Sequence, residues 1–594
     1  MQGTHKYNMG VIGNCAFMAY VDTKADVKWL CWPRFDSSFI FGGLLDEEKG
    51  GRFSIIPEES NFTTKQAYTP NTNILETDFE TSDGAFRVTD FAPRFFQYNR
   101  YYKPLMFIRK IEPLRGTPSV SIACDPVGDY GQTKTKKTLG SNHIRYGGLD
   151  QEMRLTTNIP LNYVMEESTF VLNETKYLVL TYGVPLEATL ENTVEQFLRN
   201  TTEYWINWVK STSIGNFYQD RIIRSALILK IHQYEDTGAI IAAGSASLPE
   251  FPQSTRNWDY RYCWMRDTYY TLTAFNNIGH FEEVEKYFHY IENVTKRETD
   301  RYQPLYKIDT SKKIIEKELE LSGYLGNNKP VRIGNDAYTH IQNDVYGQVL
   351  VSLLPLYVDQ RFTNTQRLHS KRLVEHTLQK IEDTMNEPDA GLWEFRNLAQ
   401  LHCYTFLFHW AGSSAAYKIA SYFKDDAMAQ KALRLKTEAA TQIEKCKLAD
   451  GTYAQAVGSP HLDASCLQLI TMQYLEPSSE AAKVHLKHME EGLKSDDGLF
   501  YRYKHEDDFG APESTFLICA YWYIEALACV GRVDEAIHYF EKLDNYKNHL
   551  GLLSEDVDAK DGSQWGNFPQ AYSHVGQVNA AYRINQKLGL PSFI

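Results

Sequence analysis

The chain has 594 residues, 43% of them apolar and 23% charged, so it can bury a large core and exceeds the length that one core normally supports. Its net charge of −13 and the lack of a dense basic run argue against a nucleic-acid partner, because phosphate binding relies on clustered Lys and Arg. The amino terminus lacks the basic and then apolar run of a secretory signal, and no stretch of about 18 apolar residues occurs, so we expect a cytoplasmic protein that does not enter a membrane.

Nine cysteines are scattered from Cys15 to Cys529, without a CxxC pair or a His/Cys cluster at zinc spacing. We therefore expect reduced core thiols, no bound metal and no cofactor. Cys263 could act as a nucleophile, but no histidine lies near it in sequence, which favours a buried thiol.

Residues 1–190 are predicted to form an antiparallel β-sandwich. The segment ILETDFETSDGAFRVTDF (74–91) contains two runs of strand-forming residues joined across Asp83 and Gly84, which is typical of a hairpin. The segments PLMFIRKIEPL, SVSIACDPV and YLVLTYGV continue in the same manner. The pattern then changes, because apolar residues from Val194 to Val209 follow helical spacing, and residues 191–218 are predicted to be a helical linker.

Residues 219–594 are predicted to form about twelve helices of two alternating kinds. Some segments carry a single apolar stripe, and others are apolar on nearly every side, so the latter should be buried in an inner ring. This alternation predicts a C-terminal (α/α)6 barrel, whereas the alternative, an open solenoid, would need a fixed-period repeat that the sequence lacks. The striped segments are 371–385, 427–447, 479–493 and 533–543, and the apolar ones are 345–358, 403–416, 466–475 and 516–530.

Irregular segments rich in aromatic and charged residues precede the inner helices. In an alternating barrel such segments open on the same rim, so we expect them to converge on one pocket. Carboxylates, arginines and aromatic rings together suit a carbohydrate ligand, since rings stack on sugar faces and charged groups bind hydroxyls. The segments are 256–267, 334–344, 387–402, 496–513 and 551–574.

Two glutamates in these segments have different neighbours. Glu394, in GLWEFR, lies between Trp393 and Phe395, and an apolar setting would raise its pKa and keep it protonated. Glu555, in GLLSEDVD, stands beside Asp556, and polar neighbours would keep it ionised. Such a pair matches the general acid and the base that glycosidic hydrolysis requires, and the alternative is that each is a solvated charge or a helix cap.

The segment RNWDYRYCWMRD (256–267) alternates aromatic and charged residues. Alternation with a period of two is typical of a strand, but its last four residues lead into a predicted inner helix, which favours the wall of a pocket. Asp259 and Arg261 could form a structural ion pair that holds this segment.

These motifs together resemble glycoside hydrolase family 15, the glucoamylase and glucodextranase family that also contains microbial trehalases. The resemblance also includes WLCWPRFDSSFIFGGLLDEEKGG (29–51), DPVGDYG (125–131) and TGAIIAAGSASLPE (237–250), in the family's order and over nearly the whole chain. It implies a β-sandwich followed by an (α/α)6 barrel, and hydrolysis of α-glucosides with inversion. It also implies that Glu394 is the general acid and Glu555 the general base.

The resemblance further implies a set of substrate-binding residues around the terminal glucose. Arg266 and Asp267 should bind its hydroxyls, and Arg502 should contact the sugar near the scissile bond. The full set is Tyr260, Trp264, Arg266, Asp267, Asp344, Trp393 and Arg502. Two places depart from the family's usual pattern: RNLAQLHCYTFLFHW follows the acid, on the leaving-group side, and Gln348 stands where many relatives carry Glu.

We therefore expect an inverting, exo-acting α-glucosidase of the glucoamylase type, which releases β-glucose from oligo- or polysaccharides. The alternatives are an α,α-trehalase, an isomaltose or dextran exo-glucosidase, a phosphorylase that uses phosphate as nucleophile, and a sugar-binding protein without catalysis. Inversion predicts that the carboxyl groups of Glu394 and Glu555 lie about 6.5–9.5 Å apart, which leaves room for water. A homo-oligomer is compatible with the sequence.

Overall fold

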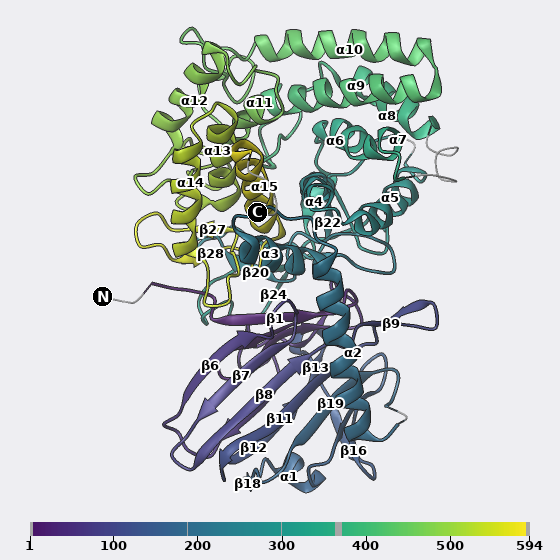
Figure 1. The fold of residues 1–594 in the computed structure, drawn as a ribbon, viewed down its shortest axis with the longest axis vertical. Coiled ribbons are helices and arrows are strands. Elements are labelled where there is room, and N and C mark those ends of the chain that lie inside the picture. The colour runs from purple at the N-terminus through teal and green to yellow at the C-terminus, as the bar shows by residue number, and fades with distance from the viewer. Residues whose placement is uncertain (1–3, 187, 299, 363–370, 590–594) are drawn as a thin grey trace.

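The structure is a computed structural model that describes residues 4–186, 188–298, 300–362 and 371–589. A β-rich N-terminal part and a helical C-terminal part lie end to end, and the long helix α2 (Leu190–Lys210) spans their junction (Figure 1). The last long strand of the β-rich part ends at Tyr182 and α3 begins at Gln219, while the boundaries at 190 and 218 stay a prediction.

The β-rich part is built on one antiparallel eight-stranded sheet, ordered β15-β16-β17-β19-β11-β8-β7-β6. The predicted hairpin is confirmed, because β7 and β8 pair from Leu75 opposite Asp90 to Glu80 opposite Ala85. The strands are β6 (Thr63–Tyr68), β7 (Leu75–Glu80), β8 (Gly84–Phe91), β11 (Met106–Gly116), β15 (Lys136–Leu139), β16 (His143–Gly147), β17 (Met153–Thr157) and β19 (Lys176–Tyr182).

Two smaller sheets cover one face of this sheet and enclose an apolar core. The aromatic rings of Phe79 and Phe86 stack at 4.5 Å within it, and Phe53 of the covering layer packs edge to face on Phe107. The predicted sandwich is thereby confirmed. The covering sheets are β1 (Met9–Gly13), β2 (Met18–Asp22), β3 (Val27–Cys31) with β4 (Phe39–Phe41), and β18 (Phe170–Val171), β12 (Ser119–Asp125) with β5 (Arg52–Pro57).

Helix α2 covers part of the opposite face of the eight-stranded sheet. Its Val194, Phe197 and Leu198 pack against Ile108 and Val179, so the helix continues the sandwich core before it reaches the barrel. The same part of the chain contains a short hairpin of β9 (Phe95–Gln97) and β10 (Arg100–Tyr102), the short β13 (Val127–Gly128) and β14 (Thr133–Lys134), and α1 (Leu161–Glu166).

The C-terminal helices form two concentric rings. The inner helices contact one another in a closed circle, from α4 to α6, α9, the α11 region, α13, α15 and back to α4. Five of the inner helices also contact an outer partner directly, and the outer helix α12 contacts the 3-10 turn Ala464–Leu467 that leads into α11. This arrangement confirms the predicted (α/α)6 barrel and excludes an open solenoid. The inner helices are α4 (Met265–Asn277), α6 (Asp344–Leu353), α9 (Cys403–Phe423), α11 (Gln468–Thr471), α13 (Leu517–Cys529) and α15 (Ala571–Leu588). The outer helices are α5 (Phe281–Thr295), α8 (Lys371–Thr384), α10 (Asp426–Glu444), α12 (Glu480–Leu493), α14 (Val533–Lys542) and α3 (Gln219–His232), and α7 (Pro355–Val358) extends α6.

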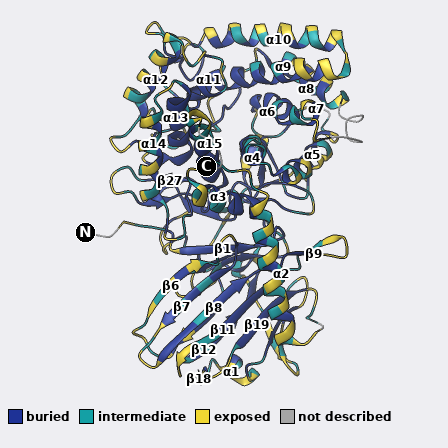
Figure 2. Cartoon of the chain, in the orientation of Figure 1, coloured by how far each residue is buried: buried dark blue, intermediate teal, exposed yellow. Residues whose placement is uncertain are grey.

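The two kinds of helix differ in burial as their sequences predict. Helix α13 is buried along almost its whole length, whereas α10 is exposed along its outer side (Figure 2). Inner helices also approach closely: a Cβ atom added to Gly412 of α9 would lie 2.5 Å from the Cα atom of Gly347 in α6. Any larger residue at this contact would push the two helices apart.

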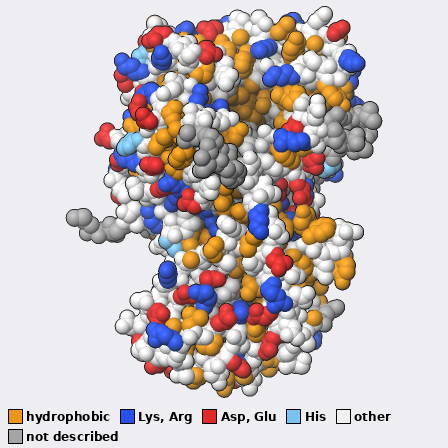
Figure 3. Space-filling view, in the orientation of Figure 1, with side chains coloured by type: hydrophobic (Ala, Val, Ile, Leu, Met, Phe, Trp, Pro, Cys, Tyr) orange, Lys and Arg blue, Asp and Glu red, His pale blue; other side chains and the backbone are white. Residues whose placement is uncertain are grey.

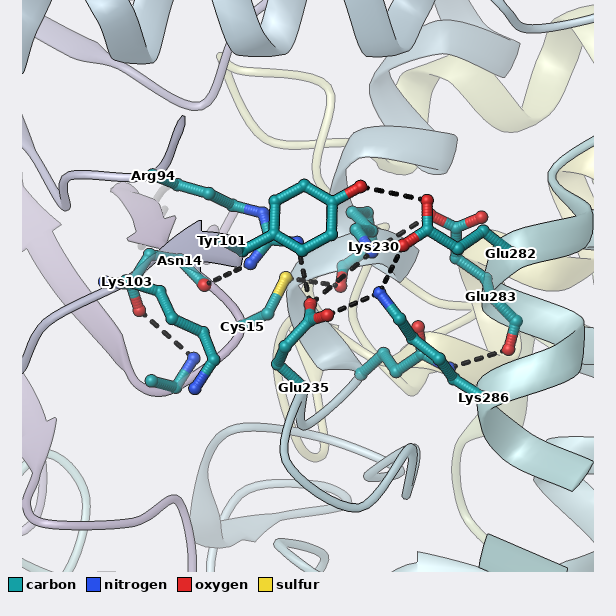
Figure 4. A network of polar contacts seen from close by, with 12 residues as sticks. Asn14, Cys15, Arg94, Tyr101, Lys103, Lys230, Glu235, Glu282, Glu283 and Lys286 are labelled. Atoms are coloured by element: carbon teal, nitrogen blue, oxygen red, sulfur yellow. Dashed lines mark hydrogen bonds and ion pairs between the residues drawn. The ribbon is translucent and has the colours of Figure 1, made fainter. Parts of the chain in front are cut away.

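A buried network of charges joins the sandwich to the barrel (Figure 4). Arg94, which is fully buried in the sandwich, donates to Glu235 at 2.7 Å. Lys286 of α5 also pairs with Glu235. Lys230 of α3 is equally buried and pairs with Glu283 at 2.9 Å. Because each cation has a carboxylate partner, the cost of burying these charges is offset.

The surface carries charges of both signs. On the face drawn in Figure 3, acidic and basic side chains are intermixed rather than grouped by sign. Among the described helices, none is long and apolar enough to cross a membrane. All nine cysteines are buried and unpaired, as expected, and burial raises the pKa of the Cys263 thiol to about 11, which argues against a nucleophile.

Glu235→Ala should lower the free energy of unfolding by about 3–5 kcal/mol, because it leaves the buried Arg94 without its carboxylate. Urea titration monitored by far-UV circular dichroism measures this loss. The matched control is Glu282→Ala, whose half-exposed carboxylate also pairs with Lys286 and should contribute less than about 1 kcal/mol. Equal losses in the two variants would contradict the role of the buried network.

Candidate active site

The segment before α4 is fixed by a buried arginine. Arg261 has no exposed surface and pairs with both carboxylate oxygens of Asp259, at 2.9 and 2.8 Å, which confirms the structural ion pair. It also donates to the backbone oxygen of Ser37 at 2.6 Å and to the Tyr130 hydroxyl at 3.1 Å, both in the sandwich. The segment contains the short strands β21 (Asn257–Asp259) and β22 (Cys263–Trp264) and then enters α4, as its last four residues predict.

A pocket opens where the predicted segments meet. Four of the five predicted segments contribute to its lining, and the fifth supplies Glu555 directly beside it, next to the pocket residue Glu250. Short strands hold these segments near the end of the barrel that faces the sandwich, where β20 (Ala246–Pro249), β27 (Asp556–Val557) and β28 (Gln564–Trp565) lie (Figure 1). The lining residues are Glu250, Arg256, Trp258, Tyr260, Asn335, Ala337, His340, Trp393, Glu394, Phe395, Arg396, Arg502, Asp507, Asp508 and Phe509.

Glu394 lies in a tight turn and points to an arginine of α4. Its backbone adopts a φ of 62°, the left-handed region that non-glycine residues seldom occupy, and such strain is frequent at functional sites. Its Oε1 atom accepts from Arg266 Nη1 at 2.9 Å, and the same nitrogen donates to the backbone oxygen of Leu392 at 2.6 Å. Arg266 therefore fixes both the carboxylate and the turn that carries it.

Glu555 is held beside the pocket by the small sheet of β26 (Thr515–Phe516), β27 and β28. Its Oε2 atom accepts from the backbone N–H of Asn567 at 3.0 Å, and its own N–H donates to the backbone oxygen of that residue. Gly566, with a φ of 73°, leaves the space that the carboxylate occupies, because an added Cβ atom would lie 2.7 Å from Oε2.

Three buried carboxyl groups gather at this position. Glu250, Glu555 and Asp556 each place one oxygen within 4.8 Å of the others. Arg502 pairs with Glu250, and both side chains are almost fully buried. The spacing of the three oxygens is compatible with a bound cation, but Arg502 already supplies a positive charge to this cluster.

The pKa shift of Glu394 has the predicted direction, whereas that of Glu555 does not. Burial raises the pKa of Glu394 and outweighs the opposing effect of Arg266, as the apolar neighbours predict. Burial and then the charge of Glu250 raise the pKa of Glu555 to about 8, so the expectation that polar neighbours keep it ionised is wrong. The deciding groups come from distant segments and from burial, rather than from the adjacent residues in the sequence.

The predicted sugar-binding residues lie around these carboxylates. Tyr260 lines the pocket together with Glu394, and burial, followed by the charges of Glu555 and Glu394, raises the pKa of its hydroxyl. The Trp264 ring packs edge to face on Tyr260, with centroids 6.2 Å apart, and lies 5.1 Å from the Arg266 guanidinium.

Asp267 and Asp344 lie near Arg266, and, like Arg266 and Trp264, they are next to the pocket residues rather than among those that line it. Asp267 accepts from Arg266 Nε at 3.1 Å, and burial raises its pKa to about 6. Asp344 begins α6, and burial, followed by the charge of Asp389, raises its pKa to about 7. Gln348 donates to Asp344 at 2.6 Å, which a glutamate at this position could do only in its protonated form.

Trp393 and two unpredicted acids complete the site. The indole Nε1 of Trp393 donates to Asp463 at 2.9 Å, which fixes the ring in the pocket wall. Neither Asp463 nor Glu250 was predicted. Glu250 ends the segment TGAIIAAGSASLPE, so this family motif was the signal that could have indicated it, whereas only the tertiary contact identifies Asp463.

Both parts of the chain match known protein families. Residues 216–582 match the model of Glycosyl hydrolases family 15, and residues 3–169 match Trehalase-like, N-terminal. A protein named trehalase from Thermoplasma volcanium is 31% identical over 98% of this chain and 93% of its own length, and one from Mycolicibacterium smegmatis is 29% identical over 97% and 90%. A bacterial glucoamylase solved with acarbose shares the fold, with a TM-score of 0.70 at 15% identity over 99% of this chain and 95% of its own.

The family match covers more than half of the chain and includes every segment that lines the pocket. It also includes Glu394, which is partly exposed, and Glu555, which is buried. The chain belongs to glycoside hydrolase family 15 and is a glycoside hydrolase.

Proposed function

We propose that this hydrolase is an α,α-trehalase, which cleaves the bond between the two anomeric carbons of trehalose. The observation that carries this proposal is the similarity over nearly the full chain to proteins named trehalase, which are up to 31% identical. The match of residues 3–169 to a trehalase-like N-terminal domain supports it independently. Both findings favour the trehalase alternative over the glucoamylase-type activity that we expected first.

In this proposal Glu394 is the general acid. Its raised pKa keeps a proton available for the glycosidic oxygen, and the left-handed turn aims the carboxyl group at the pocket. Arg266, which donates to Glu394 in the free protein, would stabilise the carboxylate that forms when the proton is transferred.

Glu555 is the general base, and it must be ionised to activate water. Glu250 and Asp556 each place an oxygen close to it, and Arg502, which pairs with Glu250, lowers the pKa of Glu555 and so favours its ionised form. When a sugar fills the pocket, Arg502 and Tyr260 would contact it near the carbon that the water attacks. Inversion then converts the attacked glucose to the β-anomer.

The terminal glucose would lie against Tyr260, Trp264 and Trp393, with its hydroxyls bound by Arg266 and Asp267. These side chains are held by contacts with one another or with Asp463, so the site is largely preformed. Preformed polar groups reduce the entropy that substrate binding must overcome. Asp344, which is not among the lining residues and accepts from Gln348, would orient Arg266 within this set.

The purified protein should hydrolyse trehalose with a kcat/KM at least about tenfold above its values for maltose and isomaltose. NMR at early times should show equal amounts of α- and β-glucose, because inversion changes only the ring that is attacked. Faster cleavage of maltose would contradict the trehalase proposal, and release of α-glucose alone would contradict inversion.

Glu394→Gln and Glu555→Gln should each lower kcat on trehalose by at least about 10²-fold, since each removes one proton-transfer group. Circular dichroism and the melting temperature should stay close to those of the native protein. Asp558→Asn is the matched control in the segment of Glu555 and should retain activity. Near-native activity in Glu555→Gln would rule out its role as base.

Glu250→Gln should shift the acid limb of the kcat/KM profile to lower pH by about one unit. The substitution removes a charge that raises the pKa of Glu555 and releases Arg502, which lowers that pKa, so the base ionises below a pH of about 8. Glu318→Gln, whose carboxylate is exposed, should keep the native profile. An unchanged acid limb in Glu250→Gln would show that this cluster does not control the base.

A further inference from the structure

The loop after Glu394 and the loop before α13 meet across the outer part of the pocket. One carboxylate oxygen of Asp508 accepts from the backbone N–H of Arg396 at 2.6 Å and of Asn397 at 3.3 Å. The other accepts from the Asn397 side chain at 2.8 Å. These three residues, here called the mouth bridge, join segments that are more than 100 residues apart in sequence.

An aromatic layer lies directly beneath the mouth bridge. The Trp258 and Phe509 rings pack edge to face, with centroids 5.3 Å apart. The Arg396 guanidinium lies 4.7 Å from the Trp258 centroid and 5.3 Å from that of Phe509, and Arg332 lies 4.8 Å from Trp258 on the same ring system. Trp258, Arg396 and Phe509 all line the pocket, so this layer forms its outer wall.

The loop that carries Asp508 is anchored on its other side as well. Asp507 pairs with Arg256 and accepts from the Tyr503 hydroxyl and from the backbone N–H of Phe509. Arg256 also donates to the backbone oxygen of Gly510 at 2.8 Å. Contacts on both sides of Asp508 therefore fix this loop, so the mouth bridge joins two segments that are already anchored.

We propose that the mouth bridge and the aromatic layer close the pocket beyond the second sugar ring and restrict the enzyme to disaccharides. Glu394 protonates the oxygen of the leaving sugar, and Glu394, Phe395 and Arg396 line the same pocket, so that sugar would lie against the wall that contains Arg396. A third ring attached to it would have to occupy the space where Asp508 contacts Arg396. The identity of the disaccharide rests on the proposed trehalase function, but the length limit does not.

The test compares trehalose with glucosyl trehalose, a trisaccharide that contains the same scissile bond and one extra glucose on the leaving ring. The native enzyme should cleave the trisaccharide with a kcat/KM at least about tenfold lower than that for trehalose. Asp508→Ala and Phe509→Ala should each raise the ratio of kcat/KM for the trisaccharide to kcat/KM for trehalose at least about tenfold, because each substitution opens the outer wall of the pocket. Glu506→Ala, an exposed position in the same loop that is not part of the lining, should keep the native ratio.

Equal cleavage of the two sugars by the native enzyme, or an unchanged ratio in both variants, would overturn the proposal. The melting temperatures of the variants establish that they are folded. If the enzyme prefers maltose to trehalose, the trehalase function fails, and the length limit is then tested in the same variants with maltose and maltotriose. The two failures are thus distinguishable.

Discussion

The arrangement of the pocket depends on the buried guanidinium of Arg261. A buried arginine is tolerated only when its donors have partners, and here those partners belong to both halves of the chain. Asp259, its carboxylate partner, also accepts from the backbone N–H of Gly334, at the start of the next segment of the rim. A single ion pair therefore positions the entry to α4 relative to the sandwich and to the neighbouring loop.

The sandwich contributes to the site without lining it. Among the described residues, every side chain in the pocket wall comes from residues 250–509, within the helical part. The sandwich instead supplies Ser37 and Tyr130 to Arg261, and Arg94 to the charged network at the junction. Through these contacts the sandwich holds the segment that leads into α4.

The alternation of inner and outer helices could be predicted because the degree of burial of a helix determines how many of its residues are apolar. A helix such as α13 is apolar on all sides only if other helices surround it, and an outer helix such as α10 needs one stripe. The short inner helix α11 was predicted from its apolar residues, although its segment begins as a 3-10 turn at Ala464. The period-two pattern of residues 256–267 also had a real counterpart, in β21 and β22, before the helix begins.

The electrostatics of the site could be predicted only where they are local. The motif of Glu394 predicted the direction of its pKa shift, which is set by burial, but it did not predict the opposing contact with Arg266, 128 residues earlier. Glu555 is governed by Glu250, about 300 residues earlier, and by burial that no adjacent residue reveals. The contact of Asp508 with the loop after the acid is likewise a property of the folded chain, as is the hydrogen bond from Trp393 to Asp463.

Gly566 leaves only enough space for the Glu555 carboxylate in its present position. Its backbone already disfavours any side chain, and the volume that a methyl group would fill is taken by the carboxylate of Glu555 and approached by that of Asp556. In a mutational library of this enzyme, position 566 would therefore behave like a catalytic residue although it carries no functional group. The missing side chain of Gly566 is therefore required for the position of the Glu555 carboxylate.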